Sequence, residues 1–462
     1  MNIPMPVFRF SLAPALGAAA LAWLSCAAPV LAQSQPSAID EVLQNGSAEW
    51  SDGYDAASVG AADVRTTIPT LSPQIVGALQ AAIAQYSDIV AKGGWPIVPA
   101  EKVLKIGMQD PIVAVLRQRL AISGDLPVEA ARSETAGAGA STAFDSYVDA
   151  AVKRFQARHG IQPDGVLGAS SYAALNIPAH LRLTQLANNL TRLKGFLAKP
   201  LPSRFVMVNI PAASVEVVED GVVVQRHTAV VGKVDRPSPI VNSKITEINF
   251  HPYWTVPASI IKKDLIPLMQ KDPTYLATWK IRVFDKKGQE VQPEQINWQS
   301  DDATNYMFKQ DPGDQNSLGI VKINFPSPEG VYMHDTPHKG TFNDDFRFDS
   351  SGCVRIQNIR ELIAWILRTT PGWDSDRVEA ELRGNDRLDV KVAQPVDLHW
   401  VYITAWSTTD GIVNFRNDIY NLDGLEQYTD GADETATPAA AGGPAPPVVG
   451  TDPTPLPGAT NG

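Results

Sequence analysis

The first half of the chain repeats apolar side chains at helical spacing. After Ser72-Pro73, a pair typical of a helix start, apolar residues recur every three or four positions, as one face of a helix requires: Val76, Leu79, Ile83, Tyr86 and Val90. Gly93-Gly94 then ends the pattern. Residues 71–100 are therefore predicted to be a helical segment, which we expect to pack on a larger domain.

Three shorter apolar stripes follow between residues 104 and 178. They are Val113, Leu116 and Leu120, then Val148, Val152 and Phe155, then Tyr172 and Leu175. Gly124-Asp125 and His159-Gly160 are typical helix stops, and a Gly/Ala/Ser-rich loop of residues 130–142 separates the first two stripes. The pattern predicts a small helical domain over residues 101–180, followed by a linker helix over residues 181–202.

From Arg204 the pattern changes to β-branched runs. Phe205–Ile210 and Val222–Val231 are predicted strands, and Asp220-Gly221 between them is a hairpin signal. Further strands are predicted at 245–250, 279–284, 319–325, 400–405 and 412–415, the last two around Asp410-Gly411. Residues 262 to about 318 are polar, aromatic and irregular, which indicates a lid-like insertion. The whole is predicted to be an α+β protein, with a small helical domain before a β-rich domain of residues 203–428.

The amino terminus has the features of a secretory signal peptide. In residues 1–32 a single charged side chain, Arg9, precedes an apolar stretch, and Val30-Leu31-Ala32 offers a cleavage site before Gln33. We therefore expect export to the periplasm, with an uncleaved membrane anchor as the open alternative. No later segment reaches about 18 consecutive apolar residues, so no transmembrane segment is expected in the mature chain.

Composition narrows the class of protein further. The chain has 462 residues, a net charge of −11 and 2 cysteines. This length suggests two or three domains, the charge argues against a protein that coats nucleic acid, and the cysteine count excludes a disulfide scaffold. Residues 33–70 are expected to be flexible, and the Pro/Ala/Gly-rich residues 429–462 to be a disordered tail. If the signal is cleaved, Cys26 leaves with it and Cys353 is the single cysteine of the mature chain.

The candidate chemistry centres on this cysteine. His334 precedes Cys353 by nineteen residues. A thiol near its ordinary pKa of ~8.5 is mostly protonated at neutral pH, but a nearby imidazole can take its proton and leave a nucleophilic thiolate. The second imidazole nitrogen needs an orienting acceptor, either a carboxylate or a backbone carbonyl. Gly352 allows a tight turn, so the N–H groups of Gly352 and Cys353 are the candidate oxyanion hole.

Neighbouring residues are candidates for binding the substrate. Arg355 suits bidentate binding of a carboxylate. Tyr332 either lines the pocket or packs in the core. Asn358 is a binding candidate too, although its spacing to Glu361 equally predicts a capping box at the start of an apolar helix, 362–367.

A zinc peptidase is the first alternative. His334 and His338 have the i, i+4 spacing of helical zinc ligands. Pro337 lies between them and disfavours a continuous helix, and no glutamate follows His334. We therefore expect no metal at this pair.

The residues around Cys353 resemble the L,D-transpeptidase (YkuD) family. Its signature is a histidine followed by Ser/Thr-His-Gly-Cys-X-Arg, and Ser350-Ser351-Gly352-Cys353-Val354-Arg355 is similar to it, except that Ser351 stands where many members have a second histidine. His334 matches the family's base, Cys353 its nucleophile, Gly352 its glycine and Arg355 its arginine. The longer motif, which includes His334-Asp335-Thr336-Pro337, looks like that of the large YcbB-like branch of the family. Members of this branch carry a wall-binding module and a lid-like insertion. In the helical domain, Ala151-Val152-Lys153-Arg154-Phe155-Gln156 and its surroundings resemble peptidoglycan-binding domain 1.

These resemblances imply a reaction and a partner. Cys353 would attack the bond between meso-diaminopimelate and D-alanine in a peptidoglycan tetrapeptide stem and form an acyl-thioester, and a diaminopimelate amine of another strand would resolve it as a 3→3 cross-link. Two alternatives keep this acyl-enzyme: water as acceptor gives an L,D-carboxypeptidase, and a protein amine gives anchoring of a protein to the wall. An alternative of another class is a non-catalytic wall-binding scaffold. Peptidoglycan is the expected partner, and nucleic acid is not. The reaction that the resemblance implies needs neither a metal nor an organic cofactor.

Overall fold

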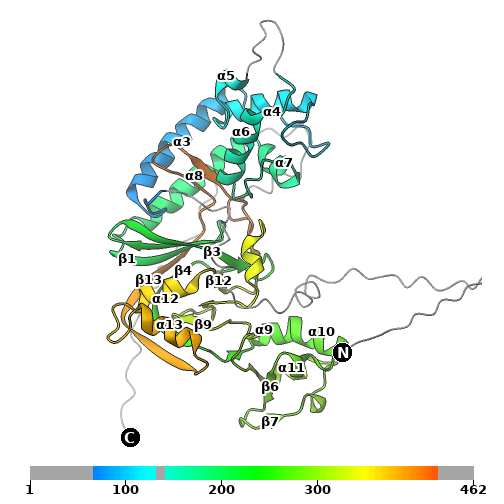
Figure 1. Cartoon of the computed structure of the whole chain (residues 1–462), viewed down its shortest axis with the longest axis vertical. Coiled ribbons are helices and arrows are strands. Elements are labelled where there is room, and N and C mark those ends of the chain that lie inside the picture. Colours follow the sequence, from blue (N-terminus) through cyan, green and yellow to red (C-terminus); the bar gives the residue numbers. More distant parts are fainter. Residues whose placement is uncertain (1–65, 132–140, 425–462) are drawn as a thin grey trace, which may run out of the picture. The chain divides into compact units, whose positions relative to one another are not determined.

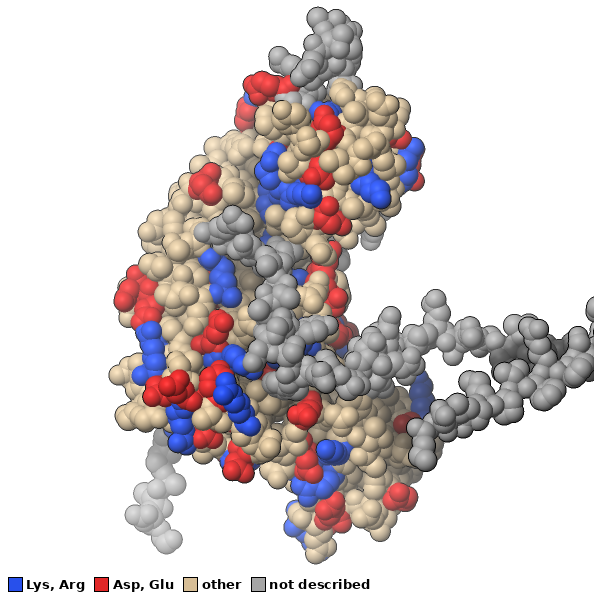
Figure 2. All heavy atoms as spheres, in the orientation of Figure 1, with Lys and Arg blue, Asp and Glu red and all other residues tan. Residues whose placement is uncertain are grey.

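The computed structural model describes residues 66–131 and 141–424, which belong to one compact unit (Figure 1). The signal peptide predicted for residues 1–32, most of the segment 33–70, the middle of the Gly/Ala/Ser-rich loop and the tail 429–462 lie outside the described residues. Within the two described ranges, no helix combines the length and the apolar character that a membrane span needs. On the face drawn in Figure 2, acidic and basic side chains of the described residues are interspersed.

Two long helices enclose the helical domain in the sequence. Helix α3 (Pro73–Ala91) begins as predicted, because Ser72 Oγ accepts from the backbone N–H of Ile75 at 3.4 Å. The predicted linker helix is α8 (Ala179–Phe196), and it packs against α3. Leu79 of α3 and Leu186 of α8 share a core with Phe205 of the first strand and with Phe415. The linker helix is therefore part of the β-rich domain's packing rather than a spacer.

The small helical domain has its own core. Its helices are α4 (Pro111–Ile122), α5 (Val128–Ala131), α6 (Ser146–Arg158) and α7 (Ala169–Leu175). The three predicted apolar stripes are buried together, from Leu116 and Leu120 to Val152, Phe155 and Leu175. This confirms the helical pattern that the sequence predicts, because each stripe faces the same interior.

A nine-stranded sheet forms the centre of the described β-rich domain. Its strands, in spatial order, are β11 (Phe348–Ser350), β3 (Val222–Gly232), β12 (Val354–Ile356), β10 (Met333–His334), β9 (Val321–Asn324), β4 (Val241–Phe250), β13 (Leu388–Val401), β1 (Arg204–Asn209) and β2 (Ser214–Glu219). Because β2 also pairs with β3, the sheet closes on itself in a barrel-like way. The α+β prediction is thus confirmed.

Two details of the predicted strands are wrong. The sequence predicts that the Asp220-Gly221 turn joins the strand 205–210 directly to the strand 222–231. In the structure a turn with Ala213 at φ 45° ends β1, the additional strand β2 follows it, and Asp220-Gly221 joins β2 to β3. Trp400 belongs to the long central strand β13, and the late hairpin pairs β14 (Ala405–Ser407) with β15 (Val413–Phe415).

The predicted insertion begins earlier than residue 262, at Trp254, and is a folded layer with a sheet of its own. It contains β5 (Trp254–Thr255), α9 (Ala258–Ile260), a π-helical turn (Ile261–Leu265), α10 (Ile266–Lys271), α11 (Tyr275–Thr278), β6 (Ile281–Phe284), β7 (Glu290–Val291) and β8 (Met307–Gln310). The sheet order is β5-β8-β6-β7, and Leu265, Met269, Val283 and Phe308 are among its buried residues. The insertion therefore has regular secondary structure, although its sequence pattern indicates an irregular segment. Its apolar residues come together only when the four strands pair, so the pattern along the chain does not reveal this core.

Two further helices follow the motif. Helix α12 (Ile359–Leu367) buries Leu362, Ile363 and Ile366 in the core of the large sheet, and α13 (Ser375–Arg383) packs against α12. Helix α12 therefore fixes the carboxyl end of β12, the strand that begins directly after Cys353.

Candidate active site

The short strand β10 carries the histidine and lies between β12 and β9. Met333 is opposite Val354 on β12 and opposite Ile323 on β9, and all three side chains are fully buried in the core. Side chains alternate between the two faces of a sheet, so the neighbours of these residues lie on the opposite face. That face carries the candidate chemistry.

Three polar residues stand side by side on this face. His334 has Arg355 of β12 on one side and Lys322 of β9 on the other. Two residues earlier along the same strands are Tyr332 and Cys353, and Val354 N donates to Tyr332 O at 3.1 Å. Tyr332 links the predicted nucleophile and base, because its ring centroid lies 5.7 Å from that of His334 and its hydroxyl contacts Cys353.

A backbone carbonyl orients the His334 imidazole. Nδ1 lies 2.5 Å from the carbonyl oxygen of Asp335. A carbonyl only accepts hydrogen bonds, so Nδ1 carries the proton and Nε2 keeps its lone pair. The Asp335 carboxylate is fully buried, accepts from Ile320 N at 3.1 Å and pairs with Lys339 at 2.5 Å. These contacts hold the Asp335 carbonyl in place.

The surroundings of His334 favour the neutral imidazole. Burial is the largest effect, and the positive charges of Arg355 and Lys322 add to it, so that the pKa of His334 falls from 6.5 to about 3. His334 is thus a neutral base at physiological pH.

Cys353 is half-buried, and burial raises the pKa of its thiol. Hydrogen bonds from the backbone and the hydroxyl of Tyr332, together with the charges of Lys322 and Arg355, act in the opposite direction. Because burial dominates, the resting thiol is protonated, and a base is needed to make the thiolate.

Tyr332 connects the thiol with the insertion. Its hydroxyl contacts Cys353 and accepts from Trp254 Nε1 of β5 at 3.2 Å. Burial raises the pKa of Tyr332, so the phenol stays neutral and can donate a hydrogen bond. Tyr332 therefore lies beside the predicted nucleophile, and its role in lining a substrate pocket stays a prediction.

Gly352 is held in a conformation that favours glycine. Its φ is +109°, its N–H donates to Ser350 Oγ at 3.1 Å, and its carbonyl accepts from Ser238 Oγ at 2.8 Å. The predicted oxyanion role of the Gly352 N–H is therefore wrong for this arrangement, because Ser350 already accepts that hydrogen. The Cys353 N–H remains from the predicted pair.

A Gly352→Ala variant is expected to lose about 1–3 kcal/mol of unfolding free energy, because alanine is strained at this φ. Its acyl-transfer rate should fall as the Cys353 turn distorts. Gly340→Ala is the matched control, since a Cβ there meets nothing within 4 Å and needs no unusual φ. Urea unfolding of both variants checks this, and equal losses would contradict it.

Ser351, at the position where many family members have histidine, contacts an arginine. Ser351 Oγ accepts from Arg236 Nη1 at 3.0 Å, and Arg236 Nη2 donates to Asp264 Oδ1 at 2.8 Å. Asp264 lies in the π-helical turn of the insertion. The insertion therefore reaches the nucleophile turn through Arg236, just as it reaches Tyr332 through Trp254.

The remaining predicted binding residues differ in their surroundings. Arg355 is 20% exposed at its side chain and makes a loose ion pair of 3.7 Å with Asp349. Asn358 precedes α12 with φ 51°, and its side chain makes no capping hydrogen bond. The predicted capping box is therefore wrong, because the Asn358 side chain caps no N–H of α12; the two residues are joined through the backbone, with Glu361 N donating to Asn358 O at 3.2 Å.

Sequence reasoning assigned no role in the site to several residues that contact Tyr332 or the nucleophile turn. Lys322, Trp254, Arg236 and Asp264 all come from segments far from the motif in the chain. Their contacts depend on strand register and on the insertion's fold, so local spacing alone does not predict them.

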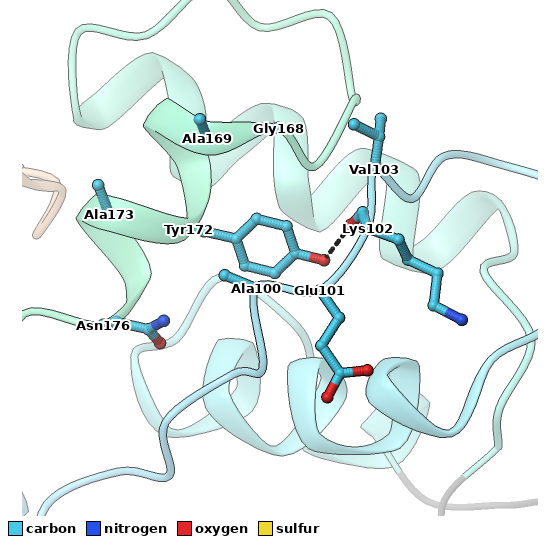
Figure 3. A pocket seen from close by; sticks show the side chains of 9 residues that line it. All are labelled: Ala100, Glu101, Lys102, Val103, Gly168, Ala169, Tyr172, Ala173 and Asn176. Atoms are coloured by element: carbon cyan, nitrogen blue, oxygen red, sulfur yellow. Dashed lines mark hydrogen bonds between the residues drawn. The ribbon is translucent and has the colours of Figure 1, made fainter.

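The helical domain has a concave surface of its own (Figure 3). The segment 100–103 faces α7, and the Tyr172 hydroxyl at its floor donates to Lys102 O at 2.8 Å. The side chains of Ala100, Val103, Ala169 and Ala173 make much of the lining apolar.

Comparisons with known proteins agree with the two resemblances. Residues 203–379 match the family described as L,D-transpeptidase catalytic domain (YkuD), and residues 109–175 match the family described as "Putative peptidoglycan binding domain". A curated relative from Haemophilus influenzae, named "Putative L,D-transpeptidase", is 33% identical over 219 residues. That match covers 47% of this chain and 44% of the relative, so the chain matches less than half of the relative's length.

Solved structures of the same kind also align with the chain. An L,D-transpeptidase (Yku) from Stackebrandtia nassauensis is 15% identical, with 64% of this chain and 94% of that chain covered and a TM-score of 0.24. An L,D-transpeptidase from Mycobacterium smegmatis is 15% identical, with 42% and 58% covered and a TM-score of 0.20.

Proposed function

We propose that this chain, which carries a YkuD-family L,D-transpeptidase catalytic domain over residues 203–379, is a peptidoglycan L,D-transpeptidase with Cys353 as its nucleophile. The observation that carries the proposal is the placement of Cys353 and His334 on either side of Tyr332, next to the β10–β12 pairing, with the His334 Nε2 lone pair left available. This arrangement supports acyl transfer through a thioester.

In the first step, His334 Nε2 takes the thiol proton and the Cys353 sulfur attacks the diaminopimelate carbonyl of a tetrapeptide stem. The Tyr332 hydroxyl and the Cys353 N–H donate to the oxygen that becomes negative. The C–N bond to D-alanine breaks, His334 returns the proton to the leaving amine, and an acyl-thioester remains.

In the second step, a diaminopimelate amine of another strand attacks the thioester. His334 takes a proton from this amine, the C–S bond breaks, and the thiolate regains a proton as the 3→3 amide forms. Water or a protein amine in place of that amine gives the carboxypeptidase or the anchoring reaction with the same groups.

The helical domain supports wall binding as part of the same proposal. The domain matches a peptidoglycan-binding family, and the concave surface between segment 100–103 and α7 offers a place for a wall ligand. We propose a periplasmic location, which rests on the signal-like residues 1–32.

The test is the product pattern of purified protein with tetrapeptide muropeptides, analysed by mass spectrometry. Dimers that have lost one D-alanine support the transpeptidase. Tripeptides without dimers favour the L,D-carboxypeptidase, and unchanged muropeptides with retained binding to sacculi favour the scaffold.

The rate of acylation is expected to change little as pH falls from 8 to 5. His334 has a pKa of about 3, so it stays a neutral base over this range, whereas an ordinary histidine would lose its base function near pH 6.5. Single-turnover release of D-alanine at each pH measures this, with circular dichroism to confirm that the protein stays folded. An inflection near pH 6.5 would contradict the neutral-base assignment.

A further inference from the structure

Lys322 is a charged residue beside the reacting groups that the mechanism above does not use. It stands opposite His334 in the β9–β10 pairing, and its ammonium lies 4.3 Å from the centroid of the Tyr332 ring. The Tyr332 hydroxyl in turn contacts the Cys353 thiol. One aromatic ring therefore separates a positive charge from the nucleophile.

The carboxylates nearest to Lys322 on this sheet face are engaged elsewhere. Glu247 pairs with Lys391 and accepts from Asn249 at 3.0 Å, and Asp389 pairs with Arg387. In the part of the chain that the structure describes, no carboxylate lies within ion-pairing distance of the Lys322 ammonium.

Lys322 is also half-buried, and this burial lowers its pKa. An ammonium that has lost part of its hydration without gaining an anion is costly, and a bound carboxylate offsets that cost. The position thus fits a ligand anion close to the thiol.

We propose that Lys322 binds the C-terminal carboxylate of the stem peptide whose carbonyl Cys353 attacks, an inference that rests on the proposed function. In a tetrapeptide stem, only the amide nitrogen and one α-carbon separate the scissile carbonyl from this carboxylate. That short span matches the single ring between the thiol and the ammonium. Lys322 therefore selects stems that end as a free acid one residue after the scissile bond.

Arg355 is the other cation beside His334, but it lies on the β12 side and already has Asp349 as a partner at 3.7 Å. Of the two cations beside His334, Lys322 is therefore the one without a carboxylate partner. Arg355 as the carboxylate's partner is a separate outcome of the test.

The experiment compares two soluble donors, a tetrapeptide ending in D-alanine and the same peptide ending in D-alanine amide. Single-turnover release of D-alanine or its amide is measured for the wild type, Lys322→Met and Lys322→Arg. Lys309→Met is the matched control, because Lys309 also lies over a tyrosine, with its ammonium 4.0 Å from the Tyr253 ring centroid. Alkylation of Cys353 by iodoacetamide, a neutral reagent, checks that each variant keeps a folded, reactive site.

We expect the wild type and Lys309→Met to prefer the acid over the amide by on the order of 10- to 100-fold, as one charge-assisted hydrogen bond provides. Lys322→Met should lose this preference, and Lys322→Arg should restore most of it. A Lys322→Met variant that keeps the full preference overturns the inference and assigns the carboxylate to Arg355. A wild type that releases neither product overturns the proposed function itself.

Discussion

Replacing Cys353 with alanine is expected to lower acyl transfer by on the order of 10⁴-fold or more, to the level of the uncatalysed reaction. The sulfur is the atom that forms the thioester, and no other cysteine occurs in the chain except Cys26, within the predicted signal peptide. Release of D-alanine from tetrapeptide muropeptides measures the loss.

The control for Cys353→Ala is to measure wall binding and stability, which this substitution should leave unchanged. Cys353 is half-buried at the start of β12, so the change to alanine removes one sulfur atom from a partly open position. Cosedimentation with sacculi and the melting temperature should therefore stay close to the wild type. If Cys353→Ala still releases D-alanine at the wild-type rate, the nucleophile assignment is wrong.

A His334→Gln variant is expected to lose between about 10²-fold and 10⁴-fold in the acylation rate. The amide has no basic nitrogen with which to take the thiol proton, and burial holds the Cys353 thiol in its protonated form. The same single-turnover assay measures the effect.

His338→Gln is the matched control for that variant. His338 is also partly buried, with its pKa lowered by burial, but it lies beyond Pro337 in the loop after β10. Its replacement should change the rate far less than His334→Gln does. Equal losses for the two variants would mean that replacing any buried histidine in this region lowers the rate, and would contradict the assignment of His334 as the base.

Much of the helical half is predictable from the sequence, because its signals are local. The Ser72-Pro73 start of α3 and the apolar stripes of α4, α6 and α7 each depend on spacing within one element. Most strands of the large sheet are visible for the same reason. Strand β2 is hidden because an unusual turn, with Ala213 at positive φ, precedes it.

The candidate site divides in the same way. Cys353, His334 and Gly352 stand in one recognisable stretch, and the sequence also allows for the backbone acceptor that the structure shows at Asp335. Lys322 and Trp254 are different, because only strand register and the folded insertion bring them to Tyr332. The hydrogen bond from Gly352 to Ser350 likewise depends on the turn's final geometry.

The most direct test of the central claim is to trap the acyl-enzyme. Wild-type protein is mixed with a tetrapeptide donor, quenched in acid within one turnover, digested with pepsin and analysed by mass spectrometry. The account predicts a peptide containing Cys353 that carries the mass of the stem tripeptide acyl group, with one D-alanine released for each adduct. Release of D-alanine with no adduct on Cys353, or with the adduct on another residue, would contradict it.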